Sequence, residues 1–458
     1  MDDDLERRLI DSIHRDPSRV ALLLGAGLSM APPSDLPSAS DLARECYRRY
    51  QARVGEQLPE DVRENLGRLA STLWNRDQLR SPFLQDIVPW DYFHGKFNDG
   101  HEAVADFLIC GAVDFVVTTN FDTLVEDAAQ ILNRPSLEPA LDGREVQDIG
   151  RARHNPYVKM HGCHKKSRRE TLWSEQQLTC PPYSDRRIPT TIRWLTGLLE
   201  YRHIIIIGFW TDWSYINALL DDCLLGLDAG DQLFVTVVDT KSTGELERSA
   251  PNLWNWVASQ DDVTFHHERQ SGADFLEDLR VSYSRRFLNR AIIQGAPRPT
   301  CHGLPTDLTG RQLYHLRRDF TGAVANDPVT QKDPGQGEAR VGEMHETLLG
   351  AGGQMVDGIR YRIRGQIIRL VNGSGYRLST VKRMVTEELG SPLEVDVVVC
   401  VGAQADPSVA HLVRDVGERE NVDAGDGKSV VDAGHNSTWV TDIEFQRWLN
   451  EGGGDEDN

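Results

Sequence analysis

The stretch that decides the fold is VALLLGAGLS, which spans Val20–Ser29. Its five apolar residues, Val20–Leu24, predict a strand buried on both faces, as in parallel sheets. The strand ends at Gly25-Ala26-Gly27, and Ser29 follows shortly after. Glycines at a strand end serve either a tight turn or a close approach of backbone N–H groups to a phosphate. Both interpretations stay open from this stretch alone, because the full GxGxxG motif is not present.

Strand and helix patterns alternate over the first 290 residues. Further buried strands are predicted at residues 113–118, 157–160, 203–207 and 233–238. Helical patterns surround them at 5–13, 121–132, 192–199, 215–225 and 273–289, and residues 38–110 are mostly helical. The alternation predicts an α/β fold, a Rossmann-like doubly wound parallel sheet, with a helical insertion at about residues 51–110.

A second, smaller unit is predicted toward the C-terminus. Residues 1–290 form the first domain, and residues 291–340, which are rich in Pro, Gly, Thr and Asp, are interpreted as a linker. Residues 341–450 are expected to form an α+β domain with a regulatory or interaction role. Its alternating apolar and basic stretch at 359–370 predicts one half-exposed strand, and 395–401 predicts another. Residues 451–458, EGGGDEDN, are expected to be a disordered acidic tail.

Composition excludes several classes of protein. With 458 residues and a net charge of −20, the chain as a whole is unsuited to nonspecific binding of nucleic acids or anionic membranes, although a local basic groove remains possible. No apolar run is long enough for a transmembrane helix, and the acidic N-terminus lacks the features of a signal peptide. The 7 cysteines are scattered without a CxxC pair, which favours a cytoplasmic protein without a disulfide framework or zinc ribbon.

Polar residues follow the strand at 113–118 in the segment Thr118-Thr-Asn-Phe-Asp122. In open α/β sheets the carboxyl ends of the strands are where ligands bind. One of Asn120 and Asp122 could simply cap the following helix by accepting hydrogen bonds from its free N–H groups. A cap needs a single side chain, so Thr119, Asn120 and Asp122 together also indicate a binding site.

Three later strands end in residues of the same kind. His161-Gly162 follows the strand at 157–160, where a histidine is placed to act as a base near neutral pH, although a lone histidine among 14 is more often structural. Gly208 ends the strand at 203–207 and permits close approach, and Asp212 either caps the next helix or binds a ligand. Asp239 ends the strand at 233–238 and is either a ribose-binding acid or an ordinary loop acid.

The order of these segments resembles that of the Sir2 (sirtuin) family over roughly residues 15–290. GAGLS is similar to the family's GAGxS phosphate loop, TTNFD to its TQN-D segment with Thr119 replacing the glutamine, MHG to its catalytic His-Gly, and GFW to its later glycine loop. The resemblance implies that His161 is the base and that Asn120 contacts the nicotinamide ribose of NAD+. It implies that Asp239 lies near the adenosine and that the phosphates are contacted by Gly25, Ala26, Gly27 and Ser29. Thr119, Asp122, Gly208 and Asp212 complete the expected NAD-binding set.

The sequence departs from the sirtuin deacylases in two places. Those enzymes carry two CxxC zinc pairs after the His-Gly, whereas this chain has only Cys163 and Cys180 there, so no metal site is expected. The family's acidic-aromatic-arginine loop after GAG is altered to Asp35-Leu-Pro-Ser-Ala-Ser40. In both respects the chain resembles the prokaryotic Sir2-like effectors of anti-phage defence. Members of that group hydrolyse NAD+ to nicotinamide and ADP-ribose.

Three functions are therefore compared. The favoured one is a regulated NAD+ hydrolase that causes abortive infection by NAD+ depletion; the others are an NAD-dependent protein deacylase and a non-catalytic sensor of NAD or ADP-ribose. The resemblance implies control by homo-oligomerisation or by a partner such as a HerA-like ATPase or a short Argonaute-like protein, with no membrane contact. The basic run from Arg360 through Arg369 to Lys382-Arg383 is either a solvated strand face or a nucleic-acid contact. The acidic stretch Glu418–Asp426 favours a protein contact instead.

Overall fold

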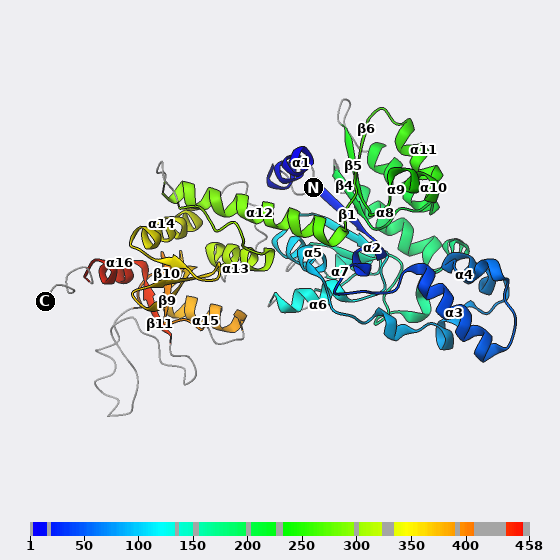
Figure 1. The fold of residues 1–458 in the computed structure, drawn as a ribbon, viewed down its shortest axis with the longest axis horizontal. Helices are drawn as coiled ribbons and strands as arrows, with labels where there is room; N and C mark the ends of the chain where they lie inside the picture. The colour runs from blue at the N-terminus through cyan, green and yellow to red at the C-terminus, as the bar shows by residue number, and fades with distance from the viewer. Residues whose placement is uncertain are drawn as a thin grey trace. The chain divides into compact units, whose positions relative to one another are not determined.

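The computed structural model describes residues 3–15, 20–132, 137–149, 155–197, 203–225, 232–296, 302–322, 334–389, 394–406 and 437–451. The chain divides into two compact units, Met1–Leu279 and Arg280–Asn458 (Figure 1). The division falls within one continuous helix, α12 (Gly272–Gly295). The predicted acidic tail after residue 451 and the acidic stretch Glu418–Asp426 lie outside the described residues.

The first unit is built on a six-stranded parallel sheet. Its strands are β1 (Val20–Leu24), β2 (Phe115–Thr118), β3 (Tyr157–Lys159), β4 (His203–Ile207), β5 (Leu233–Val238) and β6 (Val263–Glu268). Their order is β3-β2-β1-β4-β5-β6, and every pairing is parallel. This confirms the predicted doubly wound, Rossmann-like sheet. All five residues of β1 are buried because the strand pairs on both sides, with Leu22 opposite Val116 on β2 and Ile205 on β4.

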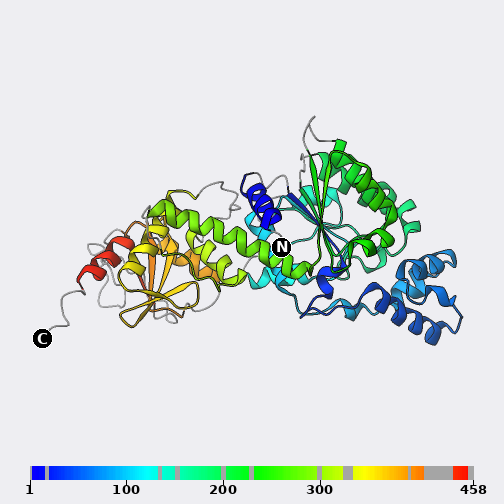
Figure 2. The same ribbon diagram turned by 45° about the horizontal axis from the view of Figure 1, so that its top comes forward.

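Helices cover both faces of this sheet. Alternate strand residues, such as Ala21 and Leu23, pack with the helices α8 (Ile188–Gly197), α9 (Ser214–Leu225), α10 (Thr243–Ser249) and α11 (Pro251–Ser259). Figure 2 shows α9 to α11 on one side of the fanned strands. The opposite face is covered by α5 (Asp99–Cys110) and the start of α12, where a Cβ on Gly272 would lie 2.3 Å from a methyl carbon of Ile207. The smaller helices are α1 (Asp3–Arg15), α2 (Ala26–Met30), α6 (Leu124–Ile131) and α7 (Gly143–Ile149).

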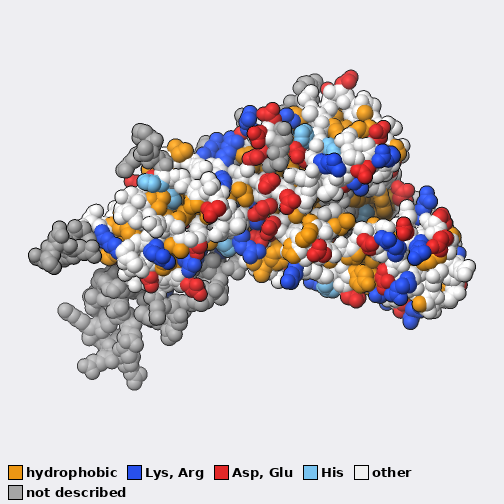
Figure 3. Space-filling view, in the orientation of Figure 1, with side chains coloured by type: hydrophobic (Ala, Val, Ile, Leu, Met, Phe, Trp, Pro, Cys, Tyr) orange, Lys and Arg blue, Asp and Glu red, His pale blue; other side chains and the backbone are white. Residues whose placement is uncertain are grey.

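A helical insertion separates β1 from β2. It contains α3 (Ala39–Val54), α4 (Leu66–Asn75) and the short helical segments η2 (Glu60–Val62), η3 (Leu79–Ile87) and η4 (Trp90–Phe93). Its own core also takes in Trp173, which stacks on Phe121 at 4.9 Å between ring centroids and meets Phe83 edge-on at 5.5 Å. The outer surface carries interspersed acidic and basic side chains over α3 and α4 (Figure 3). Trp173 therefore joins the insertion to the segment that follows His161.

One strand of the first unit was not predicted from the sequence. β6 lies at the edge of the sheet, and all six of its residues are only half-buried. Its sequence, VTFHHE, lacks the continuous apolar run that marks the inner strands. The chain between β3 and α8 contains three further short helical segments, η5 (Arg168–Glu170), η6 (Glu175–Thr179) and η7 (Tyr183–Arg187).

The second unit contains a mixed five-stranded sheet in the order β11-β10-β9-β8-β7. Its strands are β7 (Gln354–Met355), β8 (Arg360–Ile363), β9 (Gln366–Asn372), β10 (Val397–Val401) and β11 (Thr438–Thr441). The helices are α13 (Gly310–Thr321), α14 (Gln336–Gly350), α15 (Leu378–Leu389) and α16 (Asp442–Glu451). Val399 and Val401 pack with α13, α14 and α16, whereas Val398 and Cys400 pack with α15. This alternation confirms a second, smaller α+β unit.

Two expectations for this region differ from the structure. The alternating stretch 359–370 is a hairpin of β8 and β9, which turns at Arg364-Gly365 where both residues have positive φ. Residues 310–321, in the predicted linker, form α13, whose Leu313, Leu316 and Phe320 are buried in the core of the second unit. The helix was not predicted because its apolar pattern is short and the segment around it is rich in proline, glycine and threonine.

The basic residues of the hairpin are largely engaged within the protein. Arg369 is 8% exposed and forms a two-pronged ion pair with Asp319 of α13, at 2.7 and 2.8 Å. Arg360 pairs with Asp357 at 2.6 Å. Arg364 donates to the backbone carbonyls of Trp448 and Leu449 and stacks on the Trp448 ring. These three guanidinium groups hold the second unit together instead of forming an open basic face.

A buried ion pair joins β3 to α6 in the first unit. The side chain of Lys159 is completely buried, and its Nζ donates to Glu126 Oε1 at 2.7 Å and to the backbone carbonyl of Asp122. Burial alone would lower the pKa of Lys159, but the Glu126 carboxylate raises it above the ordinary value. The ammonium group therefore ties the end of β3 to the loop after β2.

We predict that Lys159→Met lowers the free energy of unfolding by about 3–5 kcal/mol, because it leaves a buried carboxylate without its cation. The double variant Lys159→Met/Glu126→Leu should recover most of this loss, since two apolar side chains replace the pair. Urea unfolding followed by tryptophan fluorescence measures both. If the double variant is as unstable as the single one, the coupling assigned to this pair is wrong.

Candidate active site

The two glycines after β1 pack directly against the end of β4. The amide of Gly25 donates to the carbonyl of Ile207 at 2.9 Å, and that of Gly27 to Gly208 at 3.2 Å. A Cβ on Gly27 would lie 2.6 Å from the Cα of Gly208, which itself has a φ of +59°. No side chain fits between these backbones. The glycines are therefore required for the turn and for strand packing, whatever they bind.

A pocket of about 680 Å³ opens where these two strands end. We call it the glycine pocket. It lies between β1 and β4, where the strand order reverses direction across the sheet. Ligands usually bind at such a point in sheets of this kind. Its volume is in the range of small-molecule sites. The lining residues are Ala26, Gly27, Met30, Ala31, Pro32, Ser38, Ala39, Ser40, Gly208, Val238, Asp239, Thr240, Lys241, Gln270, Ser271 and Gly272.

Two features of the glycine pocket suit a phosphorylated sugar. The amide of Ala26 is the first of α2 and has no backbone acceptor among the described residues, so it faces the pocket as a free donor. Asp239 places a carboxylate on the wall formed by β5, where one oxygen accepts from the amide of Lys241 at 2.9 Å. The other oxygen lies 3.8 Å from Lys241 Nζ. The pocket thus presents an amide without a backbone partner at one point and a carboxylate at another.

Ser29, Asn120 and Asp122 form one hydrogen-bond network beside this pocket. Asn120 Nδ2 donates to the carbonyl of Gly25 at 3.1 Å and to Ser29 Oγ at 3.0 Å. Ser29 Oγ donates to Asp122 Oδ2 at 2.9 Å. The other oxygen of Asp122 accepts from the amide of Leu124, the first residue of α6. Asp122 therefore caps the helix and supports the site at the same time.

The same network includes His101, which the sequence did not single out. His101 Nε2 lies 3.1 Å from Ser29 Oγ, and its Nδ1 accepts from the backbone amide of Asn98 at 3.2 Å. Since Nδ1 is an acceptor, a neutral ring carries its proton on Nε2 and donates to Ser29. Burial lowers the pKa of His101 to about 4, so the ring is neutral. The Ser29 hydroxyl accepts from His101 and Asn120 and donates to Asp122, which fixes the amide of Asn120.

Thr118 and Thr119 hold the end of β2 against the end of β1. Thr118 Oγ1 lies 3.2 Å from the carbonyl of Leu24, and Thr119 donates to that carbonyl through its backbone amide at 3.0 Å. Thr119 therefore supports the strand ends, and its side chain hydroxyl is 3.4 Å from the same carbonyl oxygen.

His161 follows β3, the strand next to β2. Thr118 pairs with Lys159, so Asn120 and His161 each lie two residues past that pair, at the same edge of the sheet. The His161 ring is 6% exposed, packs against Trp213 at 4.9 Å, and bonds through Nε2 to the Tyr215 hydroxyl at 2.6 Å. Burial, aided by the positive charge of Arg187, lowers the pKa of His161 to about 3. In this arrangement the imidazole is neutral and its Nε2 is engaged.

Asp212 is not among the residues that line the glycine pocket. Its two carboxylate oxygens accept from the amides of Asn252 and Leu253 at 3.2 and 3.1 Å, at the N-terminal end of α11. It caps a helix as one interpretation of the sequence allowed, but this is α11 and not the helix that directly follows β4.

The cysteines after His161 lie in separate surroundings. Cys163 is buried 3.8 Å from Lys159 Nζ, whereas Cys180 is half-exposed and lines a second pocket on the insertion side. Within the described residues, no group of three or more His, Cys, Asp or Glu side chains is arranged to hold a metal ion. No helix in those same ranges is both long and apolar enough to cross a bilayer.

Comparison with known protein families adds a domain assignment to this geometry. Residues 114–256 match the family of SIR2-like domains. The matched range contains Asn120, His161, Gly208 and Asp239, whereas Gly25 to Ser29 precede it. No curated protein sequence matches the chain.

Solved structures of sirtuins are among those similar to the chain. A Sir2 homologue in complex with NAD is 16% identical, with 60% of this chain and 91% of that chain covered and a TM-score of 0.30. A complex of Sir2 with a p53 peptide and NAD+ is 13% identical, covers 60% and 96%, and has a TM-score of 0.33. A mutant Sir2 homologue bound to 2'-O-acetyl-ADP-ribose is 14% identical, covers 61% and 95%, and has a TM-score of 0.31.

Several residues of the SIR2-like domain and its surroundings were missed from the sequence. The glycine pocket includes Ser38, Lys241 and the turn Gln270–Gly272, which follows the unpredicted strand β6. A prediction of β6 would have pointed to these residues, because Ser271-Gly272 follows the end of that strand just as Gly208 follows the end of β4. His101 and Lys159 lie inside a helix and a strand, where a single polar residue gives no pattern.

The buried histidines make stability depend on pH. The pKa of His101 falls from 6.5 in the unfolded chain to about 4 in the folded one, so the unfolded chain binds its proton first as the pH falls. We expect the free energy of unfolding to decrease between pH 6.5 and about 4, with His101 contributing roughly 3 kcal/mol. Urea unfolding at several pH values should give a shallower dependence for His101→Gln, which does not titrate. Equal slopes for the two proteins would contradict the buried neutral state of His101.

Proposed function

We propose that the first unit binds NAD+ and cleaves the bond between nicotinamide and ribose, releasing nicotinamide and ADP-ribose. The observation that carries the proposal is the continuity of the site. The glycine pocket adjoins Gly25, whose carbonyl holds Asn120, and Asn120 stands at the strand end next to that of His161. The SIR2-like domain match and the NAD complexes of the similar sirtuin structures support NAD+ as the ligand.

In this proposal the dinucleotide lies across the carboxyl ends of the strands. The pyrophosphate is placed at the turn Gly25–Gly27, where the free amide of Ala26 donates to it and the partial positive charge of the helix start adds to the attraction. The Asp239 carboxylate accepts from hydroxyl groups of the adenosine ribose. Ser29 acts through Asn120 instead of binding a phosphate, because all its hydrogen-bonding capacity is used within the network.

In this cleavage reaction the protein mainly has to position the reacting groups. Nicotinamide leaves as a neutral group, so the site has to shelter an oxocarbenium-like ribose and orient a water molecule. The Asn120 amide, held by Gly25 and Ser29, orients the ribose or the water. His161 accepts a proton from water or from a ribose hydroxyl.

The contact between His161 and Tyr215 supports an enzyme that is silent at rest. A base with a pKa of about 3 and an engaged Nε2 is poorly suited to accept a proton at neutral pH. Activity then requires a change that separates the ring from Tyr215 and admits substrate. Such control fits a defence effector that acts as a homo-oligomer or with a partner such as a HerA-like ATPase or a short Argonaute-like protein, because uncontrolled NAD+ hydrolysis would harm the cell.

The buried base also fits a second candidate, a module that binds NAD or ADP-ribose without cleaving it. Both candidates use the glycine pocket, so binding alone does not separate them. Product analysis does: the hydrolase forms free ADP-ribose, and the sensor leaves NAD+ intact.

We predict that wild-type protein converts NAD+ to nicotinamide and ADP-ribose, and that His161→Ala lowers the rate by at least about a hundredfold through loss of the base. Chromatography of the products and circular dichroism of the variant measure activity and folding. A folded His161→Ala protein that cleaves NAD+ at the wild-type rate would exclude this role of His161. NAD+ bound but uncleaved by the wild type under every tested oligomeric state would favour the sensor.

We predict that Tyr215→Phe raises the basal rate of NAD+ cleavage, because it removes the hydroxyl group that engages His161 Nε2 and leaves the aromatic packing intact. Chromatography of the products measures this rate. Tyr47→Phe is the matched control, since that buried hydroxyl bonds to the backbone carbonyl of Leu58 in the helical insertion and not to His161. A fall in the rate of Tyr215→Phe, with the control unchanged, would show that Tyr215 assists the base.

A further inference from the structure

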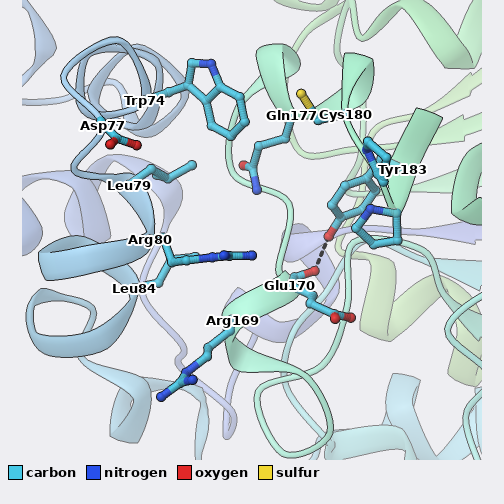
Figure 4. Close-up of a pocket in the computed structure, with 12 residues that line it drawn as sticks. Trp74, Asp77, Leu79, Arg80, Leu84, Arg169, Glu170, Gln177, Cys180 and Tyr183 are labelled. Atoms are coloured by element: carbon cyan, nitrogen blue, oxygen red, sulfur yellow. Dashed lines mark hydrogen bonds between the residues drawn. The ribbon is translucent and has the colours of Figure 1, made fainter. Parts of the chain in front are cut away.

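A second pocket, of about 500 Å³, lies between the helical insertion and the segment that follows His161 (Figure 4). We call it the arginine pocket. One wall comes from α4 and η3, and the other from the chain between η5 and η7. The lining residues are Trp74, Asp77, Leu79, Arg80, Leu84, Arg169, Glu170, Gln177, Cys180, Pro181, Pro182 and Tyr183. It shares no lining residue with the glycine pocket, so the proposed NAD+ site does not account for it.

The lining carries two unused positive charges. Among the described residues, neither Arg80 nor Arg169 forms an ion pair or a side-chain hydrogen bond. Figure 4 shows the side chain of Arg80 reaching from η3 into the space between the two walls. The carboxylate of Glu170, which also lines the pocket, is neutralised by an ion pair with Arg187 at 2.8 Å. Both arginines are exposed, the same lining holds one carboxylate without an ion pair among the described residues, that of Asp77, and guanidinium is suited to two-pronged binding of phosphate.

Flat apolar surfaces complete the walls. Trp74 turns its indole ring toward the space, and Tyr183 lies across from it (Figure 4), while Pro181 and Pro182 also line the pocket. Tyr183 is buried and firmly held, because its hydroxyl donates to the carbonyl of Glu170 and accepts from Arg187 at 3.0 Å. An indole face such as that of Trp74 stacks on the ring of a nucleobase.

We propose that the arginine pocket binds a nucleoside monophosphate, with its phosphate on Arg80 and Arg169 and its base against Trp74. The volume of the pocket, about 500 Å³, suits a ligand of this size. The site is separate from the proposed NAD+ cleavage, and its occupancy does not depend on catalysis. The wall of the arginine pocket between η5 and η7 nevertheless contacts His161. The Leu172 amide and the Tyr183 hydroxyl in this segment both bond to the backbone carbonyl of His161.

Calorimetric titration with AMP tests the proposal. AMP also suits the glycine pocket, so the titration is made with Ala26→Glu, which puts a carboxylate at an exposed position of that pocket and repels phosphate there. This protein should bind one AMP per chain. Adding Arg80→Ala and Arg169→Ala should weaken the binding at least about tenfold, because charge-assisted contacts are lost. Trp74→Ala should weaken AMP binding but leave the weaker binding of inorganic phosphate unchanged.

The matched control adds Arg63→Ala and Arg68→Ala to Ala26→Glu instead, which removes two exposed charges from the same insertion outside the pocket. It should bind AMP as tightly as Ala26→Glu alone. Two results would overturn the proposal: no AMP binding to Ala26→Glu at millimolar concentration, or equal binding by the Arg80/Arg169 and Arg63/Arg68 variants. Neither result depends on whether the protein cleaves NAD+, so the two proposals fail independently.

Discussion

The first unit depends on the close approach of two backbones, at Gly25–Gly27 after β1 and Gly208 after β4. Hydrogen bonds between these turns leave no room for a Cβ on either side. This contact brings the two central strands to a common end and opens the glycine pocket beside it. Of the two interpretations of the sequence, the structure confirms the tight turn, and the ligand loop stays a prediction.

Helix α5 contributes to the site through a chain of hydrogen bonds. His101, on the helix that leads back into β2, donates to Ser29, and Ser29 with Gly25 holds the amide of Asn120. Each donor and acceptor in this chain is determined, because the amide of Asn98 makes His101 Nδ1 an acceptor. A fixed amide is what catalysis by positioning requires, since a free side chain amide would lose orientation with every rotation. Residues far from the ligand thus decide how Asn120 is presented.

Strong local signals made part of this predictable from the sequence. The apolar run Val20–Leu24 has only one stable place, in the middle of a parallel sheet, and the polar residues after each inner strand therefore had to meet at one edge. β6 and α13 were missed for the opposite reason: the first is a half-buried edge strand, and the second is a short helix in a segment rich in turn residues. His101 was missed because its role arises only when a distant helix packs beside Ser29, and one sequence carries no sign of such pairing.

One buried guanidinium, that of Arg187, links the wall of the arginine pocket electrostatically to His161. It is fully buried, it pairs with Glu170 in the wall of the arginine pocket, and its charge helps to lower the pKa of His161. A change in the wall that draws Arg187 toward an anion would reduce its effect on the imidazole, because Coulomb interactions weaken with distance and are strong only where water is excluded. The basicity of the candidate catalytic residue is thus set partly by a neighbour that the substrate never touches. A group placed in this way can transmit binding at the arginine pocket to proton transfer at His161 without any movement of the sheet.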